Sequence, residues 1–168
     1  LGPGLTALGV QRSLARVGVT TFLVDDTNSM ARRSRWARNR VIEYPESRDP
    51  ESLHALLERL PFDKAVLIAT SDKWAAAVAG LPDNIRTRFV TSMPPQAAVE
   101  LLGDKALFAG ALQRLDVPHP WTRVIETEQD LDTIPDERWP HLFLKPADSQ
   151  SFSLLFGVKA FSVADRAD

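Results

Sequence analysis

Short apolar runs alternate with longer segments in which apolar residues recur at helical spacing. The runs are rich in β-branched residues and predict strands over 19–24, 41–44, 64–70 and 89–91. Between these runs, apolar residues such as Ala7 and Leu14 fall on one stripe, and further helices are predicted after Pro50, Ser71 and Pro94. Strands alternating with helices predict a parallel sheet covered on both faces. We therefore expect residues 1–100 to form a small doubly wound α/β domain.

The chain opens on a turn of the kind that normally follows a strand. Leu1 is followed at once by Gly2-Pro3-Gly4, and the first predicted helix begins directly after these residues. We therefore expect a strand immediately before Leu1, which is missing or shortened in this sequence.

The pattern changes after Gly103. Asp104 is placed to cap a helix with one apolar side, and residues 117–120 predict a stiff, proline-rich connector. Strands are predicted over 122–125, 142–146 and 158–163, and a short helix over 128–134. We expect residues 101–168 to form part of a second, α+β domain that is unfinished where the sequence stops.

Composition narrows the classes of protein to consider. Of the 168 residues, 44% are hydrophobic and 25% are charged, which is enough to build a core. The formal net charge of −2 argues against a nucleic-acid-binding protein, because such proteins are normally basic. No apolar run approaches the ~18 residues of a membrane span, and we expect a cytoplasmic protein without a membrane partner.

Metal and thiol chemistry find little support in the sequence. The absence of cysteine excludes disulfides, thiolate zinc sites and cysteine nucleophiles. His54, His119 and His141 lack the spacing of a histidine-built metal site. We expect no metal ligand within these 168 residues.

The opening glycines allow several interpretations. Gly2, Gly4 and Ala7 fit the relaxed pattern GxGxxG/A, and Asp25 ends the next predicted strand, where an acid would hold a ribose. Glycines let a ligand approach the backbone, and the following helix N-terminus attracts negative charge. One interpretation is an NAD(P)-binding oxidoreductase domain. The others are a tight turn without a nucleotide and a site for a smaller carboxylate or phosphate.

An arginine-rich segment surrounds Trp36 at residues 32–40. A solvated surface accounts for most of these arginines, and the acidic balance of the chain disfavours a nucleic-acid surface. Because the segment follows a strand and ligands collect at the carboxyl ends of parallel strands, one arginine is placed to meet an anionic substrate. Our candidate is Arg35.

Three segments occur in a set order in the second half of the chain. They are Gly103-Asp104-Lys105 at a helix start, Val117-Pro118-His119-Pro120 after that helix, and Phe143-Leu144-Lys145-Pro146 at a strand end. In this order, behind an α/β domain, they resemble the ATP-grasp superfamily. Segments 4–19, 34–38, 68–74, 101–122 and 142–152 look most like the predicted ATP-dependent carboxylate–amine ligases, a branch that also contains D-aspartate ligases.

This resemblance spans nearly the whole chain and implies its domain organisation. Residues 1–100 are similar to the Rossmann-like pre-ATP-grasp domain, and residues 101–168 are similar to the first part of the ATP-binding region. The implied cofactors are ATP and Mg²⁺. Lys105 matches the lysine that reaches the nucleotide phosphates, and Lys145 matches the strand lysine that contacts the α-phosphate and the adenine edge.

The resemblance also implies a loop that closes over the phosphates. Residues 148–156, which include Ser149 and Ser151, take its place, and we expect this loop to be mobile without nucleotide. It departs from the glycine-rich form of the family, because no glycine precedes Gly157. Lys159 is a candidate for a further cation.

A carboxylate substrate would then meet two turns of the first domain. Ser71-Asp72 follows one predicted strand as Gly2-Pro3-Gly4 follows another, so both turns should lie at the carboxyl edge of the sheet. Each precedes a helix and offers free backbone N–H groups. Asp72 would hold an ammonium group of an amino-acid-like substrate. The alternative is that Ser71 or Asp72 only caps its helix.

These features predict the N-terminal portion of a ligase that joins a carboxylate to an amine through an acyl phosphate. The expected partners are small-molecule carboxylates and amines. The Mg²⁺ ligands and catalytic residues of the family would follow Asp168, so no catalytic residue is assigned and the chain alone is expected to be inactive. An NAD(P)-binding domain and a non-catalytic regulatory α/β module are the alternatives.

Overall fold

The computed structural model describes residues 1–2, 4–25, 29–44, 49–146, 156–158 and 160–163. The chain divides into two compact units, Leu1–Glu100 and Leu101–Asp168. The fold is mixed α/β with small parallel sheets, which confirms the predicted class. None of the described helices is both long and apolar enough to cross a membrane.

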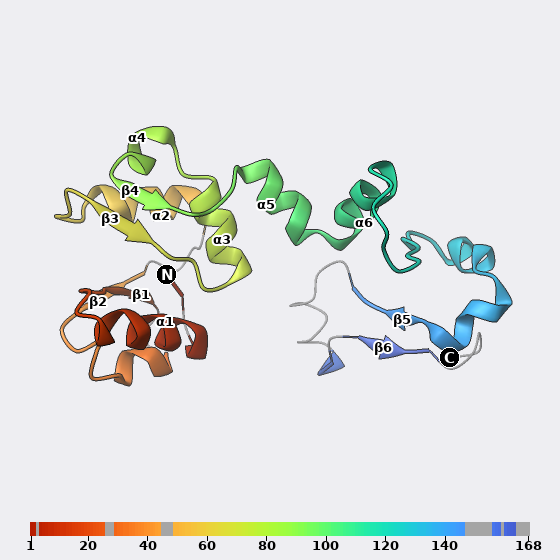
Figure 1. Ribbon diagram of the computed structural model, residues 1–168, viewed down its shortest axis with the longest axis horizontal. Helices are drawn as coiled ribbons and strands as arrows, with labels where there is room; N and C mark the ends of the chain where they lie inside the picture. The colour runs from red at the N-terminus through yellow and green to blue at the C-terminus, as the bar shows by residue number, and fades with distance from the viewer. Residues whose placement is uncertain (3, 26–28, 45–48, 147–155, 159, 164–168) are drawn as a thin grey trace. The chain divides into compact units, whose positions relative to one another are not determined.

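The first unit alternates helices and strands along the chain (Figure 1). Its elements are α1 (Gly4–Arg16), β1 (Leu23–Asp25), η1 (Met30–Arg33), β2 (Val41–Glu43), α2 (Pro50–Glu58), β3 (Ala65–Leu67), α3 (Asp72–Ala79), α4 (Asp83–Arg86), β4 (Phe89–Thr91) and the start of α5 (Gln96–Gly103). Strand β1 pairs in parallel with β2, and β3 pairs in parallel with β4. The described strands of this unit form two separate pairs, so a single doubly wound sheet stays a prediction.

Helices cover both faces of the β1–β2 pair. Leu23 belongs to a small buried cluster with Ala7 of α1, whereas Val24 belongs to a larger cluster with residues of α2 and α3. Neighbouring residues of a strand point to opposite faces, so these two clusters lie on opposite faces of the pair. Helices packed on both faces of a parallel strand pair are a feature of the doubly wound arrangement.

The helix α2 shows why the sequence folds in this way locally. Leu53, Leu56 and Leu57 recur at helical spacing and are all buried. The carboxylate of Asp49 caps the helix by accepting a hydrogen bond from the Ser52 backbone N–H over 2.7 Å. Burial of each leucine stabilises the fold by ~1.5–3 kcal/mol, so packing holds this helix more than its cap does.

The second unit has less regular structure. Its elements are α6 (Lys105–Arg114), η2 (Glu128–Thr133), η3 (Asp136–His141), β5 (Phe143–Leu144) and β6 (Phe161–Ser162), and β5 pairs with β6 in antiparallel. The predicted helix over 128–134 is the 3₁₀ helix η2. The strand predicted over 122–125 is wrong, because no described strand pairs with these residues and a strand needs such a partner.

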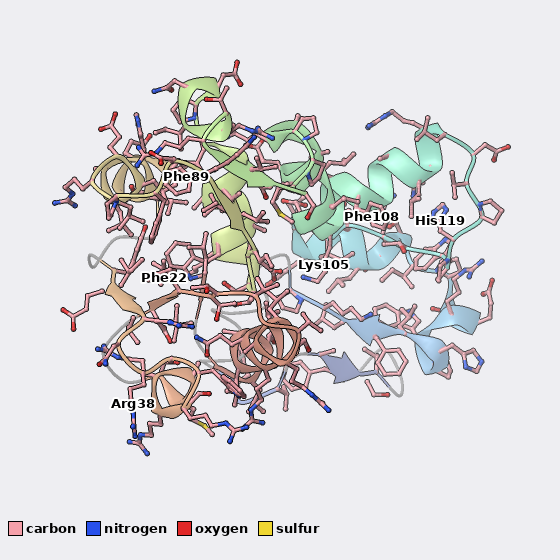
Figure 2. The ribbon with its side chains drawn as sticks, turned by 60° about the vertical axis from the view of Figure 1, so that its left-hand side comes forward. Phe22, Arg38, Phe89, Lys105, Phe108 and His119 are labelled. Atoms are coloured by element: carbon pink, nitrogen blue, oxygen red, sulfur yellow. The ribbon has the colours of Figure 1, made fainter. Side chains whose placement is uncertain are left out.

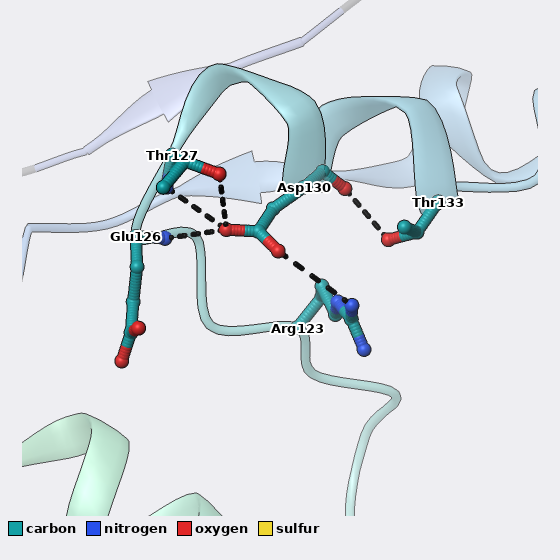
Figure 3. Close-up of polar contacts among 5 residues, drawn as sticks. All are labelled: Arg123, Glu126, Thr127, Asp130 and Thr133. Carbon is teal, nitrogen blue, oxygen red and sulfur yellow. Dashed lines mark hydrogen bonds and ion pairs between the residues drawn. The ribbon is translucent and has the colours of Figure 1, made fainter.

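Asp130 organises the turn that begins η2 (Figure 3). Its Oδ2 accepts hydrogen bonds from the backbone N–H of Glu126 at 3.0 Å and of Thr127 at 2.9 Å, and from the Thr127 hydroxyl at 3.1 Å. The Arg123 guanidinium lies 3.8 Å from Oδ1. These hydrogen bonds, led by that from the Thr127 backbone, favour the ionised form and lower the pKa of Asp130.

Candidate functional site

The predicted glycine turn lies at the carboxyl ends of β1 and β3 (Figure 1). The Gly2 backbone N–H donates to the Val24 carbonyl of β1 over 3.0 Å. On the other side, the Thr70 backbone N–H donates to the Leu1 carbonyl over 3.0 Å, and the Thr70 hydroxyl donates to the same oxygen over 2.8 Å. The first residues are therefore held between the ends of two strands of the first unit.

The two predicted turns of the first unit are neighbours. Gly2 has a φ of +119°, and a Cβ there would lie 2.6 Å from the Thr70 Oγ1 and 2.8 Å from the Trp74 Cδ1. Thr70 and Trp74 flank Ser71 and Asp72 in sequence. The fold thus places Gly2 against the segment that starts α3, and the glycine is needed there for close packing as well as for its φ.

Gly4 differs from Gly2 in its surroundings. It also has a positive φ, +86°, but a Cβ at this position would meet no atom of the described residues within 4 Å. Its backbone N–H, the first of α1, faces the Ser29 Oγ at 3.5 Å, which is a long hydrogen bond. Gly4 is therefore the glycine at which an anionic group can approach the backbone and the positive end of α1.

The start of α3 is only lightly capped. Ser71 occupies the N-cap position, but its side chain makes no capping hydrogen bond. Asp72 is the first helical residue and its side chain is exposed. The interpretation of Ser71 as a plain side-chain cap thus loses support, because its hydroxyl leaves the first N–H groups of α3 uncapped.

The indole N–H of Trp74 is a polar group beside Gly2 that the sequence interpretation missed. The side chain is only 1% exposed, and its Nε1–H has no hydrogen-bond acceptor among the residues that the structure describes. The indole nitrogen lies on the side of Gly2, 3.2 Å from where a Cβ would be, and the ring packs edge-on against Tyr44 at 4.3 Å. The sequence signal for this buried N–H group was the tryptophan two positions after Asp72.

Asp25 and the Leu1 amine set the electrostatics of the turn. Asp25, the last residue of β1, is 1% exposed. Burial lowers the pKa of the Leu1 amine from 8.0 to about 6, and the nearby Asp25 carboxylate opposes this shift. A carboxylate as buried as Asp25 does not present its oxygens to a ribose, so the dinucleotide interpretation loses support.

Arg35 contacts the residue that follows it in the sequence. Its exposed guanidinium stacks over the Trp36 ring, 4.4 Å from the ring centre. Within the same segment, Arg32 pairs with Glu43 at 3.3 Å. The contact with Trp36 does not link Arg35 to the glycine turn, so its assignment to an anionic substrate stays a prediction.

The two lysines of the second unit lie at the ends of regular elements. Lys105 is the first residue of α6, as Figure 2 shows, and Asp104 caps that helix by accepting from the N–H groups of Ala106 and Leu107 at 2.8 and 2.9 Å. Lys145 follows β5 directly and is exposed. Because Asp104 already occupies these amides of α6, any phosphate contact here would come from the lysine side chains.

Ser149, Ser151 and Lys159 lie outside the described residues, as does most of the predicted loop over 148–156. Within the described ranges, no three acidic or histidine side chains cluster as a metal site.

Two hollows on the described surface involve none of the predicted site residues. The first is lined by Pro50, Ala76, Ala77, Gln96, Val99 and Glu100, and the second by Pro120, Trp121, Glu137, Arg138, His141 and Leu142. Comparison with known proteins adds no further assignment: no family model, curated protein or solved structure matches this chain.

Proposed function

We propose that this chain is the N-terminal portion of an ATP-dependent ligase that joins a carboxylate to an amine through an acyl phosphate. The observation that carries the proposal is the placement of Lys105 and Lys145. Each lysine is exposed at the end of a regular element, the start of α6 and the end of β5, in the order that resembles the ATP-grasp superfamily.

The proposed chemistry explains why lysines would be used. ATP, when bound, supplies the phosphoryl group that activates the carboxylate. Catalysis of such a transfer depends on positioning and on neutralising phosphate charge. A lysine ammonium is a compact cation on a flexible stem, which suits that task. In this proposal Lys105 and Lys145 hold the phosphates, and the Mg²⁺ ligands lie outside the described residues.

The carboxylate substrate is assigned to the first unit. Gly4 leaves its backbone open to an approaching group, and the N-termini of α1 and α3 both favour negative charge. Asp72 is exposed at the start of α3, where it would hold the ammonium group of an amino-acid-like substrate. The complete doubly wound sheet and the ATP-grasp fold belong to the same proposal.

The alternatives make different predictions for ligand binding. An NAD(P)-binding oxidoreductase domain would bind a nicotinamide cofactor at Gly2, Gly4 and Asp25, but the burial of Asp25 disfavours a ribose contact there. A regulatory module would bind no nucleotide at all. Calorimetric titration of the full-length protein with a non-hydrolysable ATP analogue and with NAD⁺ separates the three. Binding of NAD⁺ alone, or of neither ligand, would overturn the ligase proposal.

A further inference from the structure

Leu1 lies between β1 and β3 like a residue of a parallel strand. Its amine donates to the Ile68 carbonyl over 2.7 Å, and its carbonyl accepts from the Thr70 N–H over 3.0 Å. The next amide, that of Gly2, turns to the other side and donates to the Val24 carbonyl over 3.0 Å. This alternation is the hydrogen-bond pattern of a central parallel strand, so Leu1 and Gly2 are in register with both neighbours.

On the side of β1 that faces Leu1, two backbone groups lack a hydrogen-bond partner among the described residues. The Leu23 N–H donates to the Arg40 carbonyl, on the side of β2, over 2.8 Å. Because bonding alternates along a strand, the Val24 N–H and the Phe22 carbonyl point to the opposite side, the side of Leu1. Neither group has a hydrogen-bond partner among the residues that the structure describes.

The side of β3 that faces Leu1 shows the same feature. The Ala65 N–H donates to the Arg88 carbonyl, on the side of β4, over 3.1 Å. The same alternation turns the Val66 carbonyl and the Ile68 N–H toward Leu1, and within the described part of the chain neither has a partner. We call the space bounded by Phe22, Val24, Val66 and Ile68 the strand slot.

Both faces of the strand slot adjoin apolar side chains. Leu1 packs against the larger buried cluster, which contains Val24, and Leu23 belongs to the smaller cluster on the opposite face. The rings of Phe22 and Phe62 contact each other at 4.8 Å, and Phe62 also packs against the larger cluster. On the face away from the larger cluster, Val66 of β3 is 70% exposed and Ile68 is 38% exposed. Consecutive apolar residues in an inserted strand would pack against the larger cluster on one face and against these exposed apolar side chains on the other.

We propose that the strand slot accepts an extended apolar segment joined to the Leu1 nitrogen, which pairs in parallel with β1 and β3 and unites the two strand pairs in one sheet. The residue attached to Leu1 bonds to the Phe22 carbonyl and the Val24 N–H. The residue before it bonds to the Val66 carbonyl and the Ile68 N–H. Covalent continuity with Leu1, which is already in register, selects this occupant over a strand from elsewhere.

The test is amide hydrogen exchange, measured by NMR, on the chain with an N-terminal extension. One extension is Val-Val-Ile-Val, and its control is Val-Val-Pro-Pro, which keeps length and apolar character but cannot donate a hydrogen bond to the Phe22 carbonyl or to the Val66 carbonyl. The amide of Thr91, on the outer edge of β4, serves as an internal reference because alternation turns it away from β3.

The proposal predicts that Val-Val-Ile-Val slows exchange at Val24 and Ile68 by about tenfold or more relative to the control, with Thr91 unchanged. Equal exchange with both extensions would overturn it. Protection that appears only at concentrations where light scattering detects dimers would also overturn it, because a second copy would then supply the strand.

Discussion

The Thr70 hydroxyl donates a hydrogen bond of 2.8 Å to the Leu1 carbonyl, and so ties the first residue of the chain to the segment that follows β3. The same hydroxyl oxygen lies 2.6 Å from the position of a Cβ on Gly2. One side chain therefore both holds the glycine turn in place and leaves no room for a larger residue in it. The candidate site of the first unit depends on this arrangement.

We expect Gly2→Ala to destabilise the first unit by about 1–3 kcal/mol, because the added methyl group overlaps Thr70 and Trp74 and the φ of +119° is strained for alanine. Urea unfolding followed by tryptophan fluorescence measures the change. Gly4→Ala is the matched control, since its φ is also positive but its Cβ would contact no described residue. An equal loss in both variants would show that backbone strain, and not packing, determines the cost.

In a chain that begins at Leu1, the free Leu1 amine predicts a pH dependence of stability. Its pKa falls from 8.0 when unfolded to about 6 when folded, so the unfolded chain binds more protons between these values. Stability is complete above pH 8 and is lost as the pH falls through 6. At ~1.4 kcal/mol per pKa unit, the loss is at most ~3 kcal/mol.

The comparison for this pH effect is the Nα-acetylated chain, which has no titrating amine. We expect the unfolding free energy of the free-amine chain to decline more steeply between pH 8 and 6 than that of the acetylated chain. Parallel curves would mean that the Leu1 amine is not buried in the folded state.

Asp130 predicts a local effect in the second unit. Asp130→Ala removes the acceptor for the N–H groups of Glu126 and Thr127, so we expect these two amides to exchange faster with solvent. Because the pKa of Asp130 is lowered, the wild-type hydrogen bonds persist in acid that protonates an ordinary aspartate and are lost only as the pH falls through the lowered value. Unchanged exchange in the variant would remove Asp130 from this role.

Asp72→Asn tests the substrate assignment in the first unit. The variant removes the charge but keeps an amide at the exposed start of α3. In the full-length enzyme we expect a higher KM for an amine-bearing substrate and a nearly unchanged KM for ATP. An unchanged substrate KM would remove Asp72 from the site, and a selective rise in the KM for ATP would mean that the two ligands are assigned in reverse.

The sequence predicted features that arise from local chemistry. The alternation of helices and short strands follows from apolar spacing, and the cap of α6 by Asp104 follows from the preference of aspartate for that position. The stripe of Leu53, Leu56 and Leu57 is likewise buried where the spacing placed it.

Features that depend on distant partners were not predictable. The β-branched residues over 122–125 have strand propensity, but no described strand pairs with them. The need for glycine at position 2 depends on Thr70 and Trp74, far along the chain. Likewise, the buried Nε1–H of Trp74 becomes notable only once the fold shows that no described group accepts its hydrogen bond.

Binding of a non-hydrolysable ATP analogue to Lys145→Ala and Lys64→Ala variants of the full-length protein tests the central claim most directly. Both lysines are exposed and adjoin a strand, but Lys145 follows β5 whereas Lys64 precedes β3. We predict that calorimetry finds a loss of ~1.5–3 kcal/mol in Lys145→Ala, roughly a tenfold to hundredfold weakening, and no loss in Lys64→Ala. Equal effects of the two substitutions would contradict the proposed ATP site.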